Sequence, residues 1–217
     1  MSPAIKLILG IILSVILMST QCRKDLIIEY KYKFLENVDL YPVQKSYHVG
    51  DTLWLQYSNP NHQLYDQVTN QKIFSDTLSL VFASAFNSRY EAPVNPIDSL
   101  FSLKIENALA VGNVYDYGQG VLIATTCPSS YNFRIGIVPK HTGIYSIDMP
   151  VIPETLGSCT NNMVSSPFST IEYRFNLTDC NKDVYLSIPA ASRGESLKGY
   201  TEKAIDNKRV FVFKVEG

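Results

Sequence analysis

The feature that most constrains this chain is the alternation of apolar and polar side chains over short segments. At 131–137 and at 170–177 every second residue is Tyr, Phe or an aliphatic residue, which is the pattern of a strand with one buried face. The chain also contains 14 Tyr and 10 Phe, residue types that favour sheets. Further strands are predicted at 26–34, 46–57 with a turn at Gly50 and Asp51, 77–83, 100–103, 144–147 and 210–215.

Polar segments without a period separate these strands, and 66–72 and 87–99 are expected to be loops. Residues 210–215 are almost continuously apolar, which predicts a strand covered on both faces. A helical pattern occurs at Leu197, Tyr200 and Ala204, which share one face at i, i+3 and i+7. The sequence therefore predicts an all-β, antiparallel sandwich or barrel with one short helix near the C-terminus.

The clearest predicted hairpin joins 131–137 to 144–147 through a turn at 139–143. Cys127 and Cys159 would lie at its two open ends, so we expect a Cys127–Cys159 disulfide, with the other pairings left open. Cys180 would lie nearer the turn, and it stays either buried and free or paired. No two cysteines have the short spacing of a zinc knuckle.

Two segments, Val49-Gly50-Asp51-Thr52-Leu53-Trp54-Leu55 and Thr142-Gly143-Ile144-Tyr145-Ser146-Ile147, resemble the immunoglobulin-like sandwiches common in bacterial surface proteins. The resemblance implies an immunoglobulin-like β-sandwich. We expect one such domain over 41–217, preceded by a segment at 22–40 that holds the N-terminus and the first strand.

The first residues have the features of an export signal: Lys6, an apolar run over 7–18, and a polar exit. Residues Ser19, Thr20, Gln21 and Cys22, followed by Lys24 and Asp25, resemble the signal of Bacteroidota-type lipoproteins, although Ser19 and Gln21 depart from the usual aliphatic and small residues. This resemblance implies a signal peptide at 1–21, lipidation of Cys22 and a place in the cell envelope, at the outer membrane. The alternatives are an uncleaved anchor helix, or a soluble periplasmic protein with Cys22 in a disulfide.

Composition argues against nucleic-acid binding, because the net charge is −1 and the isoelectric point is near 6.3. The chain has no nucleophile, phosphate-loop, dinucleotide or zinc-protease motif, so we expect no cofactor and no metal. The three histidines, His48, His62 and His141, are too far apart for a local metal pair, and the last two are expected in solvated turns. Residues 179–183 have the spacing that opens a calcium loop, but Val184 and Ala190 replace its Gly and Glu, which favours a polar turn.

Trp54 alternates with Leu53 and Leu55 and should therefore lie on the opposite face of its strand. With Tyr115 and Tyr117 it could form an aromatic platform for sugar rings, the alternative being that a second layer covers it. These features favour a non-catalytic binding or structural module, held at the membrane by a lipid, whose partner is an envelope protein or a glycan. Two alternatives remain open: a glycan hydrolase with dispersed carboxylates, and a subunit of a surface fibre or complex.

Overall fold

A computed structural model describes residues 32–75, 77–86, 100–106, 120–126, 131–149, 151–154, 169–193 and 195–217. The larger of its two sheets has eight strands. They are β1 (Tyr32–Tyr41), β3 (Leu53–Asn59), β4 (Gln63–Asp66), β5 (Gln71–Phe74), β7 (Phe101–Ile105), β9 (Tyr131–Pro139), β11 (Ile152–Glu154) and β12 (Ser169–Phe175). Their order is β11-β12-β1-β3-β9-β7, and β4 pairs with both β1 and β5. Only the β1–β12 pair in this sheet is parallel among the described strands.

The second sheet has five strands in the order β2-β13-β10-β6-β8. Their bounds are β2 (Ser46–His48), β6 (Thr77–Phe86), β8 (Gly120–Thr126), β10 (Gly143–Asp148) and β13 (Val210–Glu216). Of the pairs described in this sheet, β13–β2 is parallel and the others are antiparallel. The chain is therefore mostly antiparallel β-structure, as predicted, with one parallel pair in each sheet.

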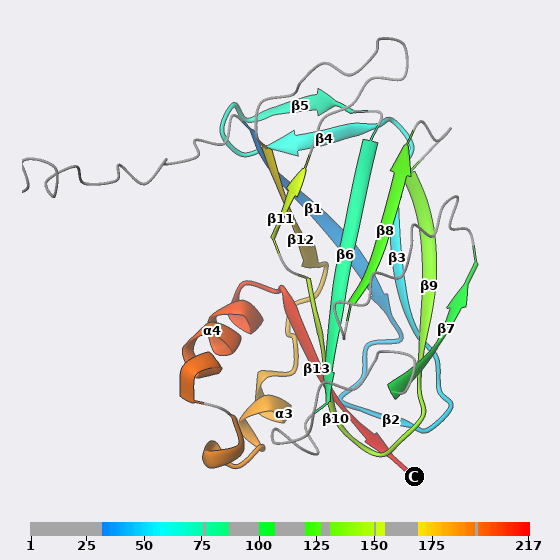
Figure 1. Cartoon of the computed structure of the whole chain (residues 1–217), viewed down its shortest axis with the longest axis vertical. Coiled ribbons are helices and arrows are strands. Elements are labelled where there is room, and N and C mark those ends of the chain that lie inside the picture. The colour runs from blue at the N-terminus through cyan, green and yellow to red at the C-terminus, as the bar shows by residue number, and fades with distance from the viewer. Residues whose placement is uncertain are drawn as a thin grey trace, which may run out of the picture.

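The two sheets pack face to face (Figure 1), and aromatic side chains fill the space between them. Phe101 of β7 meets Tyr145 of β10 at a ring-centroid distance of 5.0 Å. Phe175 of β12 and Phe211 of β13 lie 6.0 Å apart in the same way. Both contacts join strands of different sheets, so the alternating apolar residues form one shared core.

Helices cover the outer side of β13, the strand predicted to be buried on both faces. The segments α3 (Lys182–Leu186), η1 (Ala190–Arg193) and α4 (Glu195–Asp206) follow β12, and α3 and α4 contact β13. Figure 1 shows both helices on one flank of the sandwich. Val210 and Val212 are consequently buried, although Phe211 and Phe213 fill the core on the other face. The predicted helix is present as α4, with Ala204 buried, whereas α3 was not anticipated.

The predicted hairpin between 131–137 and 144–147 is wrong. β9 pairs with β3 and β7 in the larger sheet, while β10 pairs with β13 and β6 in the smaller one. The turn after Pro139 therefore carries the chain across the core, with Gly143 at a positive φ of 151° that favours glycine. The geometric basis for a Cys127–Cys159 disulfide disappears with the hairpin, and both residues lie outside the described residues. Cys180 is a buried free thiol, and burial raises its pKa to about 11.

The segment expected to be a loop at 66–72 contributes to a hairpin instead. β4 and β5 pair in antiparallel register around a turn, and Leu64 is fully buried. His62, expected in solvent, is only 9% exposed and stacks on Phe74 at 5.8 Å. The other two histidines, His48 and His141, are exposed. β4 and β5 are short, and each has only one inward aliphatic side chain. The alternation of apolar and polar residues is therefore too weak to predict these strands from the sequence.

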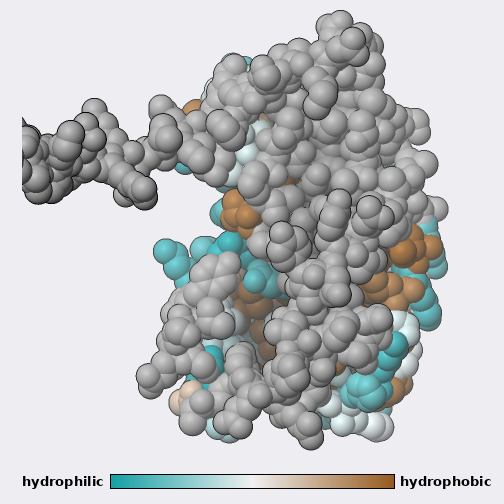
Figure 2. Space-filling view, in the orientation of Figure 1, coloured by the Kyte–Doolittle hydropathy of each residue, from teal (hydrophilic) through white to brown (hydrophobic). Residues whose placement is uncertain are grey.

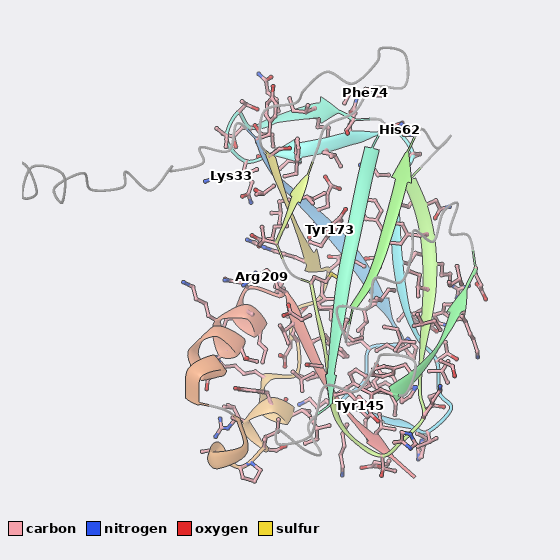
Figure 3. The ribbon with its side chains drawn as sticks, in the orientation of Figure 1. Lys33, His62, Phe74, Tyr145, Tyr173 and Arg209 are labelled. Atoms are coloured by element: carbon pink, nitrogen blue, oxygen red, sulfur yellow. The ribbon has the colours of Figure 1, made fainter. Side chains whose placement is uncertain are left out.

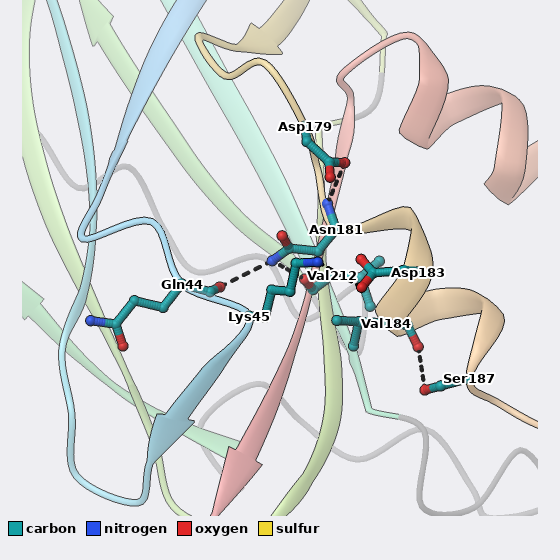
Figure 4. A network of polar contacts seen from close by, with 8 residues as sticks. All are labelled: Gln44, Lys45, Asp179, Asn181, Asp183, Val184, Ser187 and Val212. Carbon is teal, nitrogen blue, oxygen red and sulfur yellow. Dashed lines mark hydrogen bonds and ion pairs between the residues drawn. The ribbon is translucent and has the colours of Figure 1, made fainter.

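Asn181 links three parts of the fold at the start of α3 (Figure 4). Its side-chain amide donates to the backbone carbonyls of Gln44, at 3.0 Å, and Val212, at 2.8 Å. Its backbone lies in the left-handed region, with φ 59°, and its N–H donates to Asp179 at 2.9 Å. Asp183 instead pairs with Lys45, so segment 179–183 is a structural polar turn.

We expect two substitutions of Asn181 to separate the contribution of its side-chain amide from that of its left-handed backbone. Asn181→Gly keeps the left-handed backbone but leaves two carbonyls without their donor, which should cost about 1–3 kcal/mol of unfolding free energy. Asn181→Ala should cost about 1–2 kcal/mol more, because a side chain with a Cβ is strained at this φ. Urea unfolding measures both values, and a glycine variant as stable as the parent would contradict the proposed role of the amide.

Candidate functional site

The outer face of the larger sheet carries an aromatic row at one end. The strand register places Tyr41 of β1 beside Trp54 of β3, Trp54 beside Gly136 of β9, and Gly136 beside Lys104 of β7. We call this surface, together with Arg134, the Trp54 face. Trp54 is half-buried and Tyr41 is 69% exposed, whereas Leu53 and Leu55 point into the core. The predicted outward direction of Trp54 is confirmed.

Arg134 holds the indole of Trp54 in place. Its guanidinium carbon lies 4.1 Å from the ring centroid, which is a cation–π contact. The same guanidinium forms a 2.5 Å ion pair with Glu106. Because Glu106 holds the guanidinium against the indole, this contact fixes the orientation of the ring and occupies part of its surface.

Gly136 leaves the space that the indole occupies. A Cβ at this position would lie 2.7 Å from Thr52 Cγ2, 3.0 Å from Trp54 Cζ3 and 3.2 Å from Lys104 Cβ. The ring thus covers a glycine in the middle of the sheet, an arrangement that compensates for the missing side chain. Lys104 is fixed nearby, since its ammonium donates to the Thr52 hydroxyl at 2.9 Å.

Polar side chains surround the aromatic row. Asp39 and Gln56 occupy the next paired positions on the outer face, beside Arg134, and both are exposed. At the β7–β9 margin of the molecule, apolar and polar residues lie side by side on the surface (Figure 2). A flat surface that combines ring faces with hydrogen-bonding groups is suited to a ligand that has both CH-rich faces and hydroxyls.

The other residues predicted for function lie outside the described residues. They are Tyr115 and Tyr117 of the platform, Cys22, and the cysteines Cys127 and Cys159. The structure therefore leaves their roles as predictions. Sequence reasoning missed Tyr41, Arg134 and Gly136, which reach Trp54 only through the register of strands that are distant in the chain.

The two described carboxyl groups whose pKa is raised do not lie together. Burial raises the pKa of Glu36 on β1, against the lowering effect of hydrogen bonds from the Tyr65 N–H and the Tyr57 hydroxyl. Burial likewise raises the pKa of Asp148 on β10, with Arg209 opposing the rise. These two groups belong to different sheets.

Two surface grooves lie near the β1–β2 and β12–α3 connections. The larger, about 460 Å³, is lined by Val43, Gln44, Lys45, Asn176, Leu177, Thr178, Asp179 and Asn181. The smaller, about 230 Å³, is lined by Leu35, Asn37, Arg174, Phe175, Asn176, Asp206, Asn207 and Lys208. Each groove presents a single carboxylate, Asp179 or Asp206.

Within the described ranges, no three His, Cys, Asp or Glu side chains form a cluster suited to a metal ion. The helices that the structure describes are all too short or too polar to cross a bilayer. Comparison of the chain with protein-family models gives no match, and a search of curated proteins gives none either.

The packing of Gly136 gives a direct test of the Trp54 face. Gly136→Ala should cost about 1–3 kcal/mol of stability and displace the indole, because the new methyl group overlaps Thr52 Cγ2 and crowds the ring. Trp54 is the sole tryptophan of the chain, so its emission should shift to longer wavelength as the ring becomes more exposed.

The matched control is Thr52→Ser/Gly136→Ala. Serine removes the methyl group of the closest contact and keeps the hydroxyl that accepts from Lys104. Most of the lost stability should return. An unchanged unfolding free energy in Gly136→Ala alone would show that the indole does not pack on this glycine.

Proposed function

We propose that this chain is a lipid-anchored, non-catalytic module of the cell envelope that binds a glycan on its Trp54 face. The observation that carries the proposal is the pairing of an exposed Tyr41 with a half-buried Trp54, in register on the outer face of the larger sheet. Ring faces stack on the CH-rich faces of sugars, and such contacts contribute without any catalytic group.

The polar groups around the row support a sugar more than a purely apolar partner. Asp39 and Gln56 provide acceptors and donors for hydroxyl groups, and both are exposed. Arg134 keeps the indole oriented, so little conformational entropy is lost when a ligand stacks on it. An envelope protein that docks on the same face is the competing partner, and the binding experiment below separates the two.

Hydrolysis of the glycan receives less support from the described residues. A glycosidase of the common kind needs two carboxyls about 5–10 Å apart around the bound sugar. Glu36 and Asp148 lie on different sheets, and each of the two grooves contributes one carboxylate. The Trp54 face has the character of a binding surface.

The lipid anchor rests on the resemblance of residues 19–22 to a lipoprotein signal, with Cys22 as the acceptor. Tyr32, the first residue of β1, follows Cys22 by ten residues. A connection of this length spans at most about 35 Å. The acylated cysteine would thus hold the sandwich close to the membrane, with each buried CH₂ worth about 0.8 kcal/mol.

Glycan binding should depend on the aromatic row. We expect Trp54→Ala and Tyr41→Ala each to weaken co-sedimentation with isolated peptidoglycan or purified surface polysaccharide about tenfold, because a stacked ring contributes about 1.4 kcal/mol. Leu186→Ala, which removes an exposed apolar side chain from α3, is the control and should bind normally. Equal binding by all three variants, or capture of protein and no glycan by the parent chain, would contradict the glycan proposal.

Membrane retention should depend on Cys22. The mature protein should begin at an acylated Cys22 by mass spectrometry and fractionate with membranes, while Cys22→Ala should appear in the soluble fraction. Cys180→Ala, which removes a buried thiol elsewhere, should stay with the membrane. Retention of Cys22→Ala with an intact Met1 would instead support an uncleaved helix.

A further inference from the structure

The hairpin of β4 and β5 presents an unusual concentration of exposed apolar side chains. Of the nine exposed large apolar residues in the described part of the chain, three lie on it: Tyr65 at 40%, Val68 at 54% and Phe74 at 60%. The rest of the hairpin is short and mostly polar. Their exposure has a cost in water that a partner would remove.

Tyr65 and Phe74 project from one side of the hairpin, and Val68 lies in its turn. Tyr65 is opposite Lys72 and Gln63 is opposite Phe74 in the antiparallel register, so all four side chains point the same way. Leu64 and Asp66 point to the other side and are fully buried. We call Tyr65, Val68, Lys72 and Phe74 the hairpin face.

The hairpin face is held rigidly. Asp66 accepts hydrogen bonds from the Lys33 N–H at 2.8 Å, from the Thr69 N–H at 2.9 Å and from the Thr69 hydroxyl at 2.6 Å. Burial alone would raise the pKa of Asp66, but these bonds hold it below its usual value, so the carboxylate stays ionised and fixes the turn. The Phe74 ring is supported by the His62 ring.

The hairpin face lies at the end of the sandwich where the described chain begins. Phe34, two residues after the start of β1, pairs with Asp66 of β4. Figure 1 shows β4 and β5 crossing this end, and Figure 3 places Lys33, His62 and Phe74 there, far from Tyr145. Because Cys22 is ten residues before Tyr32, a lipid on that cysteine would hold this end nearest the membrane.

Charge complements the apolar side chains. Lys33 and Lys72 are exposed at this end. Aromatic side chains with flanking lysines are the composition that proteins place at the headgroup level of a bilayer, where each lysine near an anionic surface contributes about fivefold to binding.

We propose that the hairpin face docks on the anionic headgroup layer of the membrane that holds the lipid anchor. This inference rests on the proposed lipidation of Cys22, and it adds an orientation. The β4–β5 end of the sandwich then contacts the membrane. Trp54 pairs with Tyr41, nine residues beyond Tyr32, so the Trp54 face lies about 30 Å farther along the oblique strand β1.

The test uses a single tryptophan as a depth probe in the full chain. Trp54→Phe/Phe74→Trp places the probe on the hairpin face, and Trp54→Phe/Val49→Trp places it at an exposed residue after β2 as the matched control. The lipidated proteins are reconstituted in vesicles of phosphatidylethanolamine and phosphatidylglycerol that contain brominated acyl chains. We expect strong quenching at position 74 and little at position 49. In the unlipidated Cys22→Ala chain, an added Lys72→Gln should weaken vesicle association about fivefold.

The outcomes separate docking from anchoring. A lipidated chain that stays on the vesicles while position 74 is no more quenched than position 49 overturns the docking and leaves the anchor intact. If Cys22 proves unmodified, the Cys22→Ala chain is added to the same vesicles at saturating lipid. Quenching confined to position 74 then supports the hairpin face alone, and its absence overturns it. A dimer in lipid-free solution that Phe74→Ser dissociates would assign the face to a second copy and also overturn the proposal.

Discussion

The layer of inward aromatic side chains between the two sheets is the constraint on which the rest of the structure depends. Phe101 packs on Tyr145, and Phe175 packs on Phe211, each across the space between the sheets. A buried aromatic side chain removes about 150–250 Å² from water, so this layer commits one face of every core strand. The opposite face of β1, β3 and β9 is consequently left for Tyr41, Trp54 and Arg134. The candidate binding surface is a consequence of the same alternation that forms the core.

The sequence determines which way a side chain faces far better than which strand lies beside it. Phe133, Ile135 and Ile137 were expected on one buried face, and all three are buried. Their strand was nevertheless paired wrongly with β10, because a period of two is identical in a hairpin and in a connection between sheets. The turn after Pro139 is long enough to cross the roughly 10 Å between packed sheets. The β4–β5 hairpin was not predicted because Tyr65 and Phe74 point outward, so its apolar residues do not mark the buried face.

The candidate site was predictable only in part. The outward direction of Trp54 follows from its neighbours Leu53 and Leu55, but its partners come from β1, β7 and β9. No local motif marks Gly136 or Arg134, and their meaning appears only when the register brings them beside the indole. The lipoprotein-like signal supports a separate proposal, namely where such a surface would be presented. Together with the short connection between Cys22 and β1, this signal leads us to propose an oriented binding module that is held at the membrane.

The Trp54 face is the proposed binding surface for the ligand. Acrylamide quenching of the chain's sole tryptophan, measured with and without soluble fragments of the envelope glycan, would detect a ligand bound there. We expect saturating glycan to lower the quenching constant of Trp54 several-fold, because a stacked sugar shields the exposed part of the ring. Glycan binding that leaves the quenching constant unchanged would place the ligand elsewhere on the molecule and contradict the claim.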